Sequence, residues 1–98
     1  MSRRVCIGLM LLVFLSFSLS GCYYFSARSE MKSAEKLLSD LKAAGGPTLV
    51  PYEYTSAEKF LEISVMETKE DDWKAARDFA IRSKSAAQAG LAEVKKKK

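Results

Sequence analysis

The chain has 98 residues, which leaves room for one domain at most. Its net charge of +4 arises at the two ends, from Arg3 and Arg4 and from the run Lys95–Lys98, whereas residues 22–94 carry ten basic and twelve acidic side chains. That balance argues against a nucleic-acid-binding surface, so we expect no nucleic-acid partner. The lack of histidine excludes Ser–His–Asp or Cys–His catalysis and the common zinc sites, so we expect no enzyme.

Residues 1–21 have the three-part layout of a secretory signal. A basic start with Arg3 and Arg4 precedes an apolar run from Val5 to Leu19, and small residues follow. At about 1.5 Å per residue this run spans roughly 22 Å, less than the roughly 30 Å of a hydrocarbon core. Its length therefore favours a cleavable signal helix over a permanent membrane span.

The signal ends in Leu19-Ser20-Gly21-Cys22, which resembles the lipobox of bacterial lipoproteins. The resemblance implies cleavage between Gly21 and Cys22, a diacylglycerol on the Cys22 sulfur and an N-acyl chain such as palmitate on the new amino group. Two or more acyl chains suffice for stable anchoring, at about 0.8 kcal/mol per buried methylene. Tyr23 follows where an aspartate would resemble an inner-membrane signal of enteric bacteria, so the resemblance implies the outer membrane, facing the periplasm. Cys6 would leave with the signal, so no internal disulfide is expected.

Residues 22–25 would then form a lipidated tether, followed by an alanine-rich helical domain over residues 26–94. The first helix is expected over about 26–44, and Gly45-Gly46-Pro47 should end it as a turn. Apolar side chains recur on one face of this helix at spacings of three and four. They are Ala27, Met31, Ala34, Leu38 and Leu41, with Leu37 widening the stripe.

A second helix is expected over about 51–69. Pro51 suits its first position, where a missing N–H costs nothing. Thr55-Ser56-Ala57-Glu58 also fits a capping box, which would start the helix at Thr55 instead. The predicted inner face comprises Tyr54, Ala57, Leu61, Ser64 and Thr68, with Phe60 and Val65 beside it.

A third helix is expected over about 72–94, capped by Asp71 or Asp72. Its predicted inner face is built mostly of small residues, which let a neighbouring helix approach closely. These are Trp73, Ala76, Ala80, Ser83, Ala87, Gly90 and Val94. The short connection makes the last two helices an antiparallel hairpin. The expected fold class is all-α, a small bundle in which the N-terminal helix covers this hairpin.

Two segments, Pro51-Tyr52-Glu53-Tyr54-x-x-Ala57-x-x-x-Leu61 and Asp72-Trp73-x-x-Ala76-x-x-x-Ala80, resemble an alanine-rich helical domain of unknown function in bacterial envelope proteins. The resemblance covers about residues 27–92. Members are often small lipoproteins or lie ahead of an OmpA-like peptidoglycan-binding domain. We expect no OmpA-like domain here, so the resemblance does not imply peptidoglycan binding, and it brings no catalytic residues.

The aromatic residues Tyr52, Tyr54, Phe60, Trp73 and Phe79 could line a groove, but their helical spacing favours a core. The acidic run from Glu67 to Asp72 lacks the ligand spacing and central glycine of a calcium loop, so we expect capping and no metal site.

The tail of Lys95, Lys96, Lys97 and Lys98 has three interpretations. It is a solvated end that complements the helix C-terminus, a contact for anionic lipid headgroups or cell-wall polymers, or a covalent link from Lys98 to peptidoglycan. The last would resemble the major murein lipoprotein, although Gly45-Gly46-Pro47 interrupts the single long helix of that protein.

The sequence therefore predicts a lipid-anchored, non-enzymatic envelope protein. We expect a scaffold or accessory subunit of a cell-envelope assembly, working through an envelope protein partner or self-association. The alternative is a binding module for a cell-wall or anionic lipid ligand, including a peptidoglycan tether through the lysine tail. The acyl chains on Cys22 are the only covalent additions expected, with no cofactor.

Overall fold

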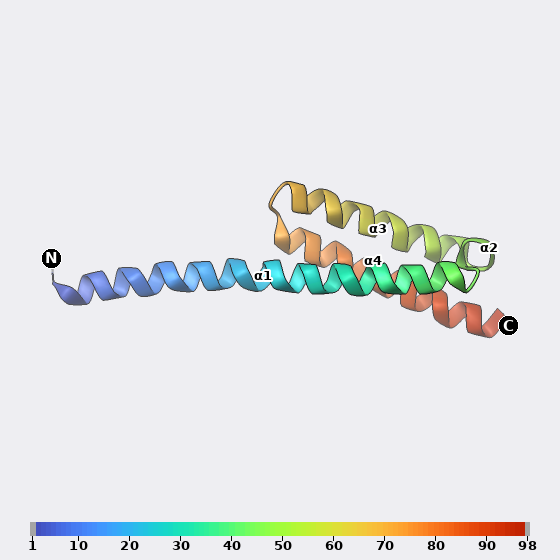
Figure 1. Ribbon diagram of the computed structural model, residues 1–98, viewed down its shortest axis with the longest axis horizontal. Helices are drawn as coiled ribbons and strands as arrows, with labels where there is room; N and C mark the ends of the chain where they lie inside the picture. Colours follow the sequence, from blue (N-terminus) through green and yellow to red (C-terminus); the bar gives the residue numbers. More distant parts are fainter. Residues whose placement is uncertain (1, 98) are drawn as a thin grey trace.

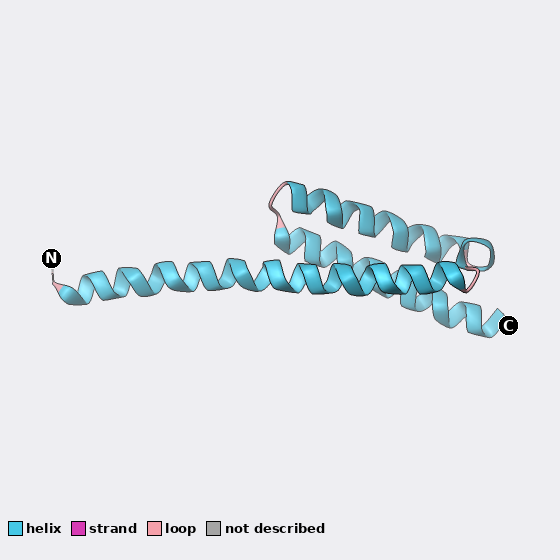
Figure 2. Cartoon of the chain, viewed as in Figure 1, coloured by secondary structure: helices cyan, strands magenta, loops and turns pink. Residues whose placement is uncertain are grey.

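The computed structural model describes residues 2–97, with side-chain surroundings for residues 2–15 and 22–97. Over these residues the chain is all-α and contains no strand, as predicted (Figure 2). The helices are α1 (Arg3–Ala43), α2 (Gly46–Leu49), α3 (Pro51–Lys69) and α4 (Trp73–Lys97). The molecule measures 70 × 22 × 15 Å, because the first half of α1 projects alone beyond a bundle formed by the other segments (Figure 1).

The helix α1 is longer than expected. A signal helix, a tether over 22–25 and a separate helix over about 26–44 were predicted, whereas α1 runs unbroken through all three. Gly21 alone is a weak helix breaker, at about 1 kcal/mol relative to alanine, and no proline accompanies it. Residues 22–25 are therefore helical in the full-length chain. That they form a lipidated tether after cleavage stays a prediction.

The connection between α1 and α3 contains a single helical turn, α2, where only a turn was expected. Gly45 adopts a φ of 89°, the left-handed conformation that lets glycine end a helix. Pro47 lies in the first turn of α2 and Pro51 in the first turn of α3, where the missing N–H removes no helical bond. The helix α3 therefore begins at Pro51, and the alternative start at Thr55 is wrong.

The turn between α3 and α4 is held by backbone and side-chain bonds. The N–H of Asp71 donates to the Thr68 carbonyl over 3.1 Å, and the N–H of Asp72 donates to the Glu67 carbonyl over 3.0 Å. This pattern is the Schellman motif, with Asp71 in the left-handed region at a φ of 58°. Asp72 Oδ1 accepts the N–H of Ala75 over 3.0 Å, so Asp72 is the predicted cap of α4.

The helix α4 is the centre of the bundle. It packs along both α1 and α3, which meet each other over a shorter stretch. It runs antiparallel to α3, as predicted, and parallel to α1 (Figure 1). Its predicted inner face is buried, apart from the half-buried Trp73 at its start. The buried residues are Ala76, Ala80, Ser83, Ala87, Gly90 and Val94.

Two buried serines join α3 to α4. Ser64 Oγ donates to the Ala76 carbonyl, and Ser83 Oγ donates to the Ala57 carbonyl, each over 2.6 Å. One bond thus runs in each direction between the helices. Because each hydroxyl reaches a main-chain acceptor, both polar groups are satisfied without adding bulk to the interface.

The bundle has two ends of different construction. We call them the Cys22 end, which also holds the α3–α4 turn, and the α2 end, which holds α2 and the last turn of α4. The α2 end contains the aliphatic core of Leu41, Val50 and Val94. Leu41 fills a space left by two glycines, since a Cβ on Gly90 would lie 2.8 Å from Leu41 Cδ2 and one on Gly46 2.6 Å from Leu41 Cγ.

Candidate anchor site and surface grooves

Cys22 lies where α1 joins the bundle. Before it, the described apolar side chains from Val5 to Leu15 are exposed. After it, contacts with α4 begin at once, because the Tyr24 ring packs edge-on against Trp73 with centroids 4.6 Å apart. Cys22 itself is exposed and carries a free thiol. The thiol is therefore open to modification at the first residue of the bundle.

The rest of the lipobox, Leu19, Ser20 and Gly21, belongs to α1 but lies outside the residues whose side chains the structure describes. Within the described part of the chain, no helix has an apolar stretch long enough to cross a membrane.

Four aromatic residues gather around α1 directly after Cys22. We call Tyr23, Tyr24, Phe25 and Trp73 the aromatic collar. Successive residues point about 100° apart on a helix, so the first three surround α1. Tyr24 meets Phe25 edge-on at 5.5 Å as well as Trp73, and Phe25 is 73% exposed. Sequence reasoning missed this group, although three consecutive aromatic residues after the lipobox signalled it.

Arg77 of α4 lies beside the collar. Its guanidinium is 5.9 Å from the centre of the Tyr23 ring. Its Nε is buried and has no hydrogen-bond partner among the described residues. Cys22, Tyr23, Ser26 and Arg77 line a shallow cleft of about 280 Å³ at this point.

The remaining aromatic residues do not form one groove. Phe60 and Phe79 stack between α3 and α4 with centroids 6.3 Å apart, and Tyr54 packs on the aliphatic core at the α2 end. Tyr54 is thus packed against the core, as predicted, whereas Phe60 and Phe79 are half-buried. Tyr52 is 78% exposed, so its assignment to the core is wrong. It stands in the first turn of α3, where it lines an open groove of about 350 Å³ together with Phe60.

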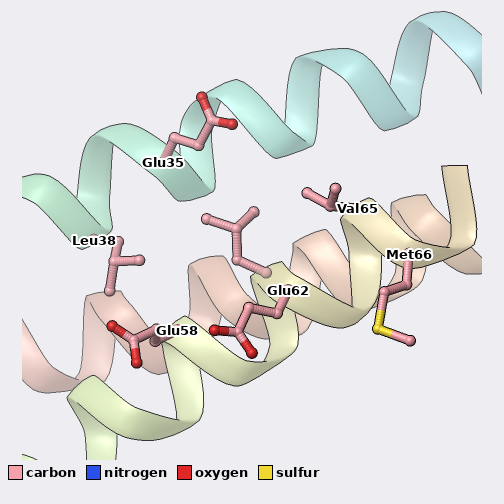
Figure 3. Close-up of a pocket in the computed structure, with 7 residues that line it drawn as sticks. Glu35, Leu38, Glu58, Glu62, Val65 and Met66 are labelled. Carbon is pink, nitrogen blue, oxygen red and sulfur yellow. The ribbon is translucent and has the colours of Figure 1, made fainter. Parts of the chain in front are cut away.

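An open groove of about 480 Å³ lies between α1 and α3. Figure 3 shows Leu38 of α1 and Val65 of α3 between the two ribbons, with the carboxylates of Glu58 and Glu62 on the α3 side. We call it the α1–α3 groove, lined by Glu35, Leu38, Glu58, Leu61, Glu62, Val65 and Met66. The helical spacing predicted that Leu61 and Val65 belong to the core. Instead, α1 and α3 are held apart by α4, so both side chains remain accessible in the groove.

The carboxylates of the α1–α3 groove differ in their partners. Glu62 pairs with Lys59 over 3.3 Å at an exposed position. Glu58 accepts a hydrogen bond from the Tyr54 hydroxyl. The pKa of Tyr54 is raised above its ordinary value of 10.0, mainly because the hydroxyl loses contact with water. The negative charge of Glu58 and the hydrogen bond to it raise this pKa further. No basic side chain is among the residues that line the groove. Its rim is therefore acidic.

The described lysines of the tail, Lys95, Lys96 and Lys97, form the last turn of α4 at the α2 end. Lys97 Nζ donates to the Leu49 carbonyl over 2.7 Å, and so caps the C-terminus of α2. Lys96 pairs with Glu93 over 3.4 Å, while Lys98 lies outside the described residues. From Trp73 to Lys97 the rise of α4 is about 36 Å, so these lysines are remote from Cys22.

The described residues hold no group of three or more His, Cys, Asp or Glu side chains that could bind a metal ion. In the acidic run, Asp72 serves as a helix cap and Asp71 as the left-handed turn residue.

Comparisons with protein families, with curated proteins and with solved structures find no match for this chain. The resemblances to lipoproteins and to the alanine-rich envelope domain therefore stay predictions.

Proposed function

We propose that this chain is a bacterial lipoprotein, held on a membrane by acyl chains on Cys22. The supporting observation is that the expected cleavage point lies where α1 begins to contact α4. The lipobox resemblance sets the cleavage point between Gly21 and Cys22, and the described contacts between α1 and α4 begin at Tyr23 and Tyr24. Cleavage there would remove the unpacked half of α1 and leave intact every interhelical bond described above. With Tyr23 after the cysteine, the outer membrane facing the periplasm is the proposed location.

The anchor is tested by the mass of the protein recovered from bacterial membranes. The wild type should begin at Cys22 and carry the mass of diacylglycerol and an N-acyl chain. Cys22→Ser should stay uncleaved or leave the membrane, whereas Cys6→Ser, which changes the other exposed cysteine, should be processed normally. An unmodified Cys22, or a wild-type protein that keeps Met1, would exclude the lipoprotein.

At the membrane, the proposed role is that of a non-enzymatic scaffold or accessory subunit. The α1–α3 groove supports this role, because it combines an apolar floor with an acidic rim. A partner of matching chemistry is a helix with one apolar face flanked by Lys or Arg, which would bury its apolar side chains and complement the rim.

The partner proposal is tested by capture from detergent-solubilised envelope with the acylated protein. Val65→Arg places a cation in the groove and should abolish capture of the partner. Thr55→Arg is the matched control, since Thr55 is exposed on α3 but does not line the α1–α3 groove. If both variants capture the partner equally well, the α1–α3 groove is not the partner-binding site.

The second candidate function is a cell-wall contact through the lysine tail. Lys95 and Lys96 are exposed roughly 33–35 Å along α4 from Trp73 at the Cys22 end, which favours a ligand away from the anchoring membrane. Purified peptidoglycan should bind the wild type but not the double variant Lys95→Gln, Lys96→Gln. Equal binding of the two proteins would exclude the lysine tail as the cell-wall contact. A covalent link at Lys98 would survive boiling in detergent, whereas a charge contact would not.

A further inference from the structure

We infer that the aromatic collar lies in the phospholipid headgroup region and sets the height and orientation of the bundle on the membrane. The inference rests on the proposed anchoring at Cys22. The collar would contact the surface of the bilayer, and this contact would add to the anchoring by the acyl chains on Cys22.

The helix α1 is continuous across Cys22. Because the helix runs unbroken through residues 22–25, no flexible tether separates the anchored cysteine from the bundle. Phe25 lies about 5 Å along the helix axis from Cys22. Trp73 is fixed to the same level by its edge-on contact with Tyr24 at 4.6 Å. Once Cys22 is anchored, all four collar residues are brought to the membrane surface.

The chemistry of the collar matches that surface. Tyrosine and tryptophan combine an apolar ring with one polar atom and are enriched at membrane–water interfaces. Phe25 exposes 73% of its surface. Such an apolar ring gains nothing from contact with water but would gain from contact with lipid. Contact of such a ring with the membrane interface is favourable, because it removes apolar surface from water.

The charges beside the collar indicate which part of the lipid it meets. Arg28 lies over the Tyr24 ring at 5.8 Å, and the buried Nε of Arg77 lacks an acceptor. The Arg77 side chain lines the cleft beside Cys22, where phosphate oxygens of phospholipids would pair with its guanidinium group. The α3–α4 turn at the same end carries Glu70, Asp71 and Asp72, which oppose attraction to an anionic surface. The contact is therefore with the phosphate and interfacial layer of phospholipids in general, and it does not require anionic lipid.

Trp73 is the single tryptophan of the chain and reports on this contact directly. The acylated protein is reconstituted into phosphatidylcholine vesicles, with and without lipid brominated close to the headgroup. We expect the brominated lipid to quench most of the Trp73 emission, and the emission maximum to shift to shorter wavelength relative to detergent-free Cys22→Ser protein.

A distal probe gives the matched control. In the double variant Trp73→Phe, Tyr52→Trp, the indole moves to the exposed position 52, about 27 Å along α3 from the turn at the Cys22 end. This probe should remain unquenched. Equal quenching at both positions would mean that the bundle lies flat, and no quenching at either would mean that it stands clear of the lipid. Either result overturns the inference.

A pair of exposed aromatic residues tests the collar itself. Phe25→Ser removes the most exposed collar side chain and should reduce Trp73 quenching. Tyr52→Ser changes a residue of similar exposure, 78% against 73%, at the opposite end of α3, and should leave the quenching unchanged. Mass spectrometry of the same samples separates the two proposals. An unmodified Cys22 refutes the anchor, whereas an acylated protein with unquenched Trp73 refutes only the collar.

Discussion

The two ends of the bundle differ in composition and burial. At the α2 end, Leu41, Val50 and Val94 are at most 3% exposed and bury aliphatic surface between three helices and α2. At the Cys22 end, large aromatic side chains lie half-buried or exposed, with Phe25 at 73%. From this difference we expect the α2 end to contribute more to folding stability than the Cys22 end. The Cys22 end leaves aromatic surface exposed to solvent.

The largest effect is expected from Leu41→Ala at the α2 end. Leu41 is fully buried, and truncation would leave a cavity next to Gly46 and Gly90. We expect a loss of about 3 kcal/mol in the free energy of unfolding, measured by urea denaturation followed by circular dichroism. A loss below about 1 kcal/mol would show that the aliphatic core is not the main source of stability.

Gly90→Val should come next. Even a Cβ at this position would lie 2.8 Å from Leu41 Cδ2 and 3.1 Å from Glu53 Cβ, so a larger side chain must push α1 or α3 away from α4. Overpacking of this kind costs about 2 kcal/mol. Ala89→Val, on the exposed neighbouring position, is the control and should cost no more than about 0.5 kcal/mol. Similar urea midpoints for the two variants would refute the close approach.

Ser83→Ala should have an intermediate effect in the middle of the bundle. It removes the donor to the Ala57 carbonyl and nothing else, which costs about 1 kcal/mol. Ser85→Ala is the control, because Ser85 is exposed on the same helix. If the two serine variants unfold at the same urea concentration, the bonds between α3 and α4 do not contribute to stability.

The smallest effect is expected at the Cys22 end. Phe25→Ala should change the free energy of unfolding by less than about 0.5 kcal/mol, because little of the ring is buried within the protein. The same substitution should still reduce the contact between the protein and phospholipid vesicles. A loss comparable to that of Leu41→Ala would remove the distinction between the two ends.

Local patterns in the sequence were enough to predict most of the helices. Residues 51–69 and the cap at Asp72 follow from proline at a first helical position and a carboxylate before an amphipathic segment. The small-residue face of α4 follows from spacings of three and four. The start of the first domain helix was misjudged, because the sequence around Cys22 has no strong helix breaker and α1 continues through it.

The sequence by itself determined that the chain is all-α, where its main breaks lie and which faces turn inward, since these depend on residues within a few turns of one another. It also carried the lipobox resemblance, a linear signal that needs no fold. Only the tertiary structure decided that α4 lies at the centre, that Trp73 meets Tyr24 beside Cys22, and that Leu41 enters the space left by Gly90. These contacts join residues far apart in the chain, and they depend on how three helices share one small core. Periodicity along a single helix does not contain that information.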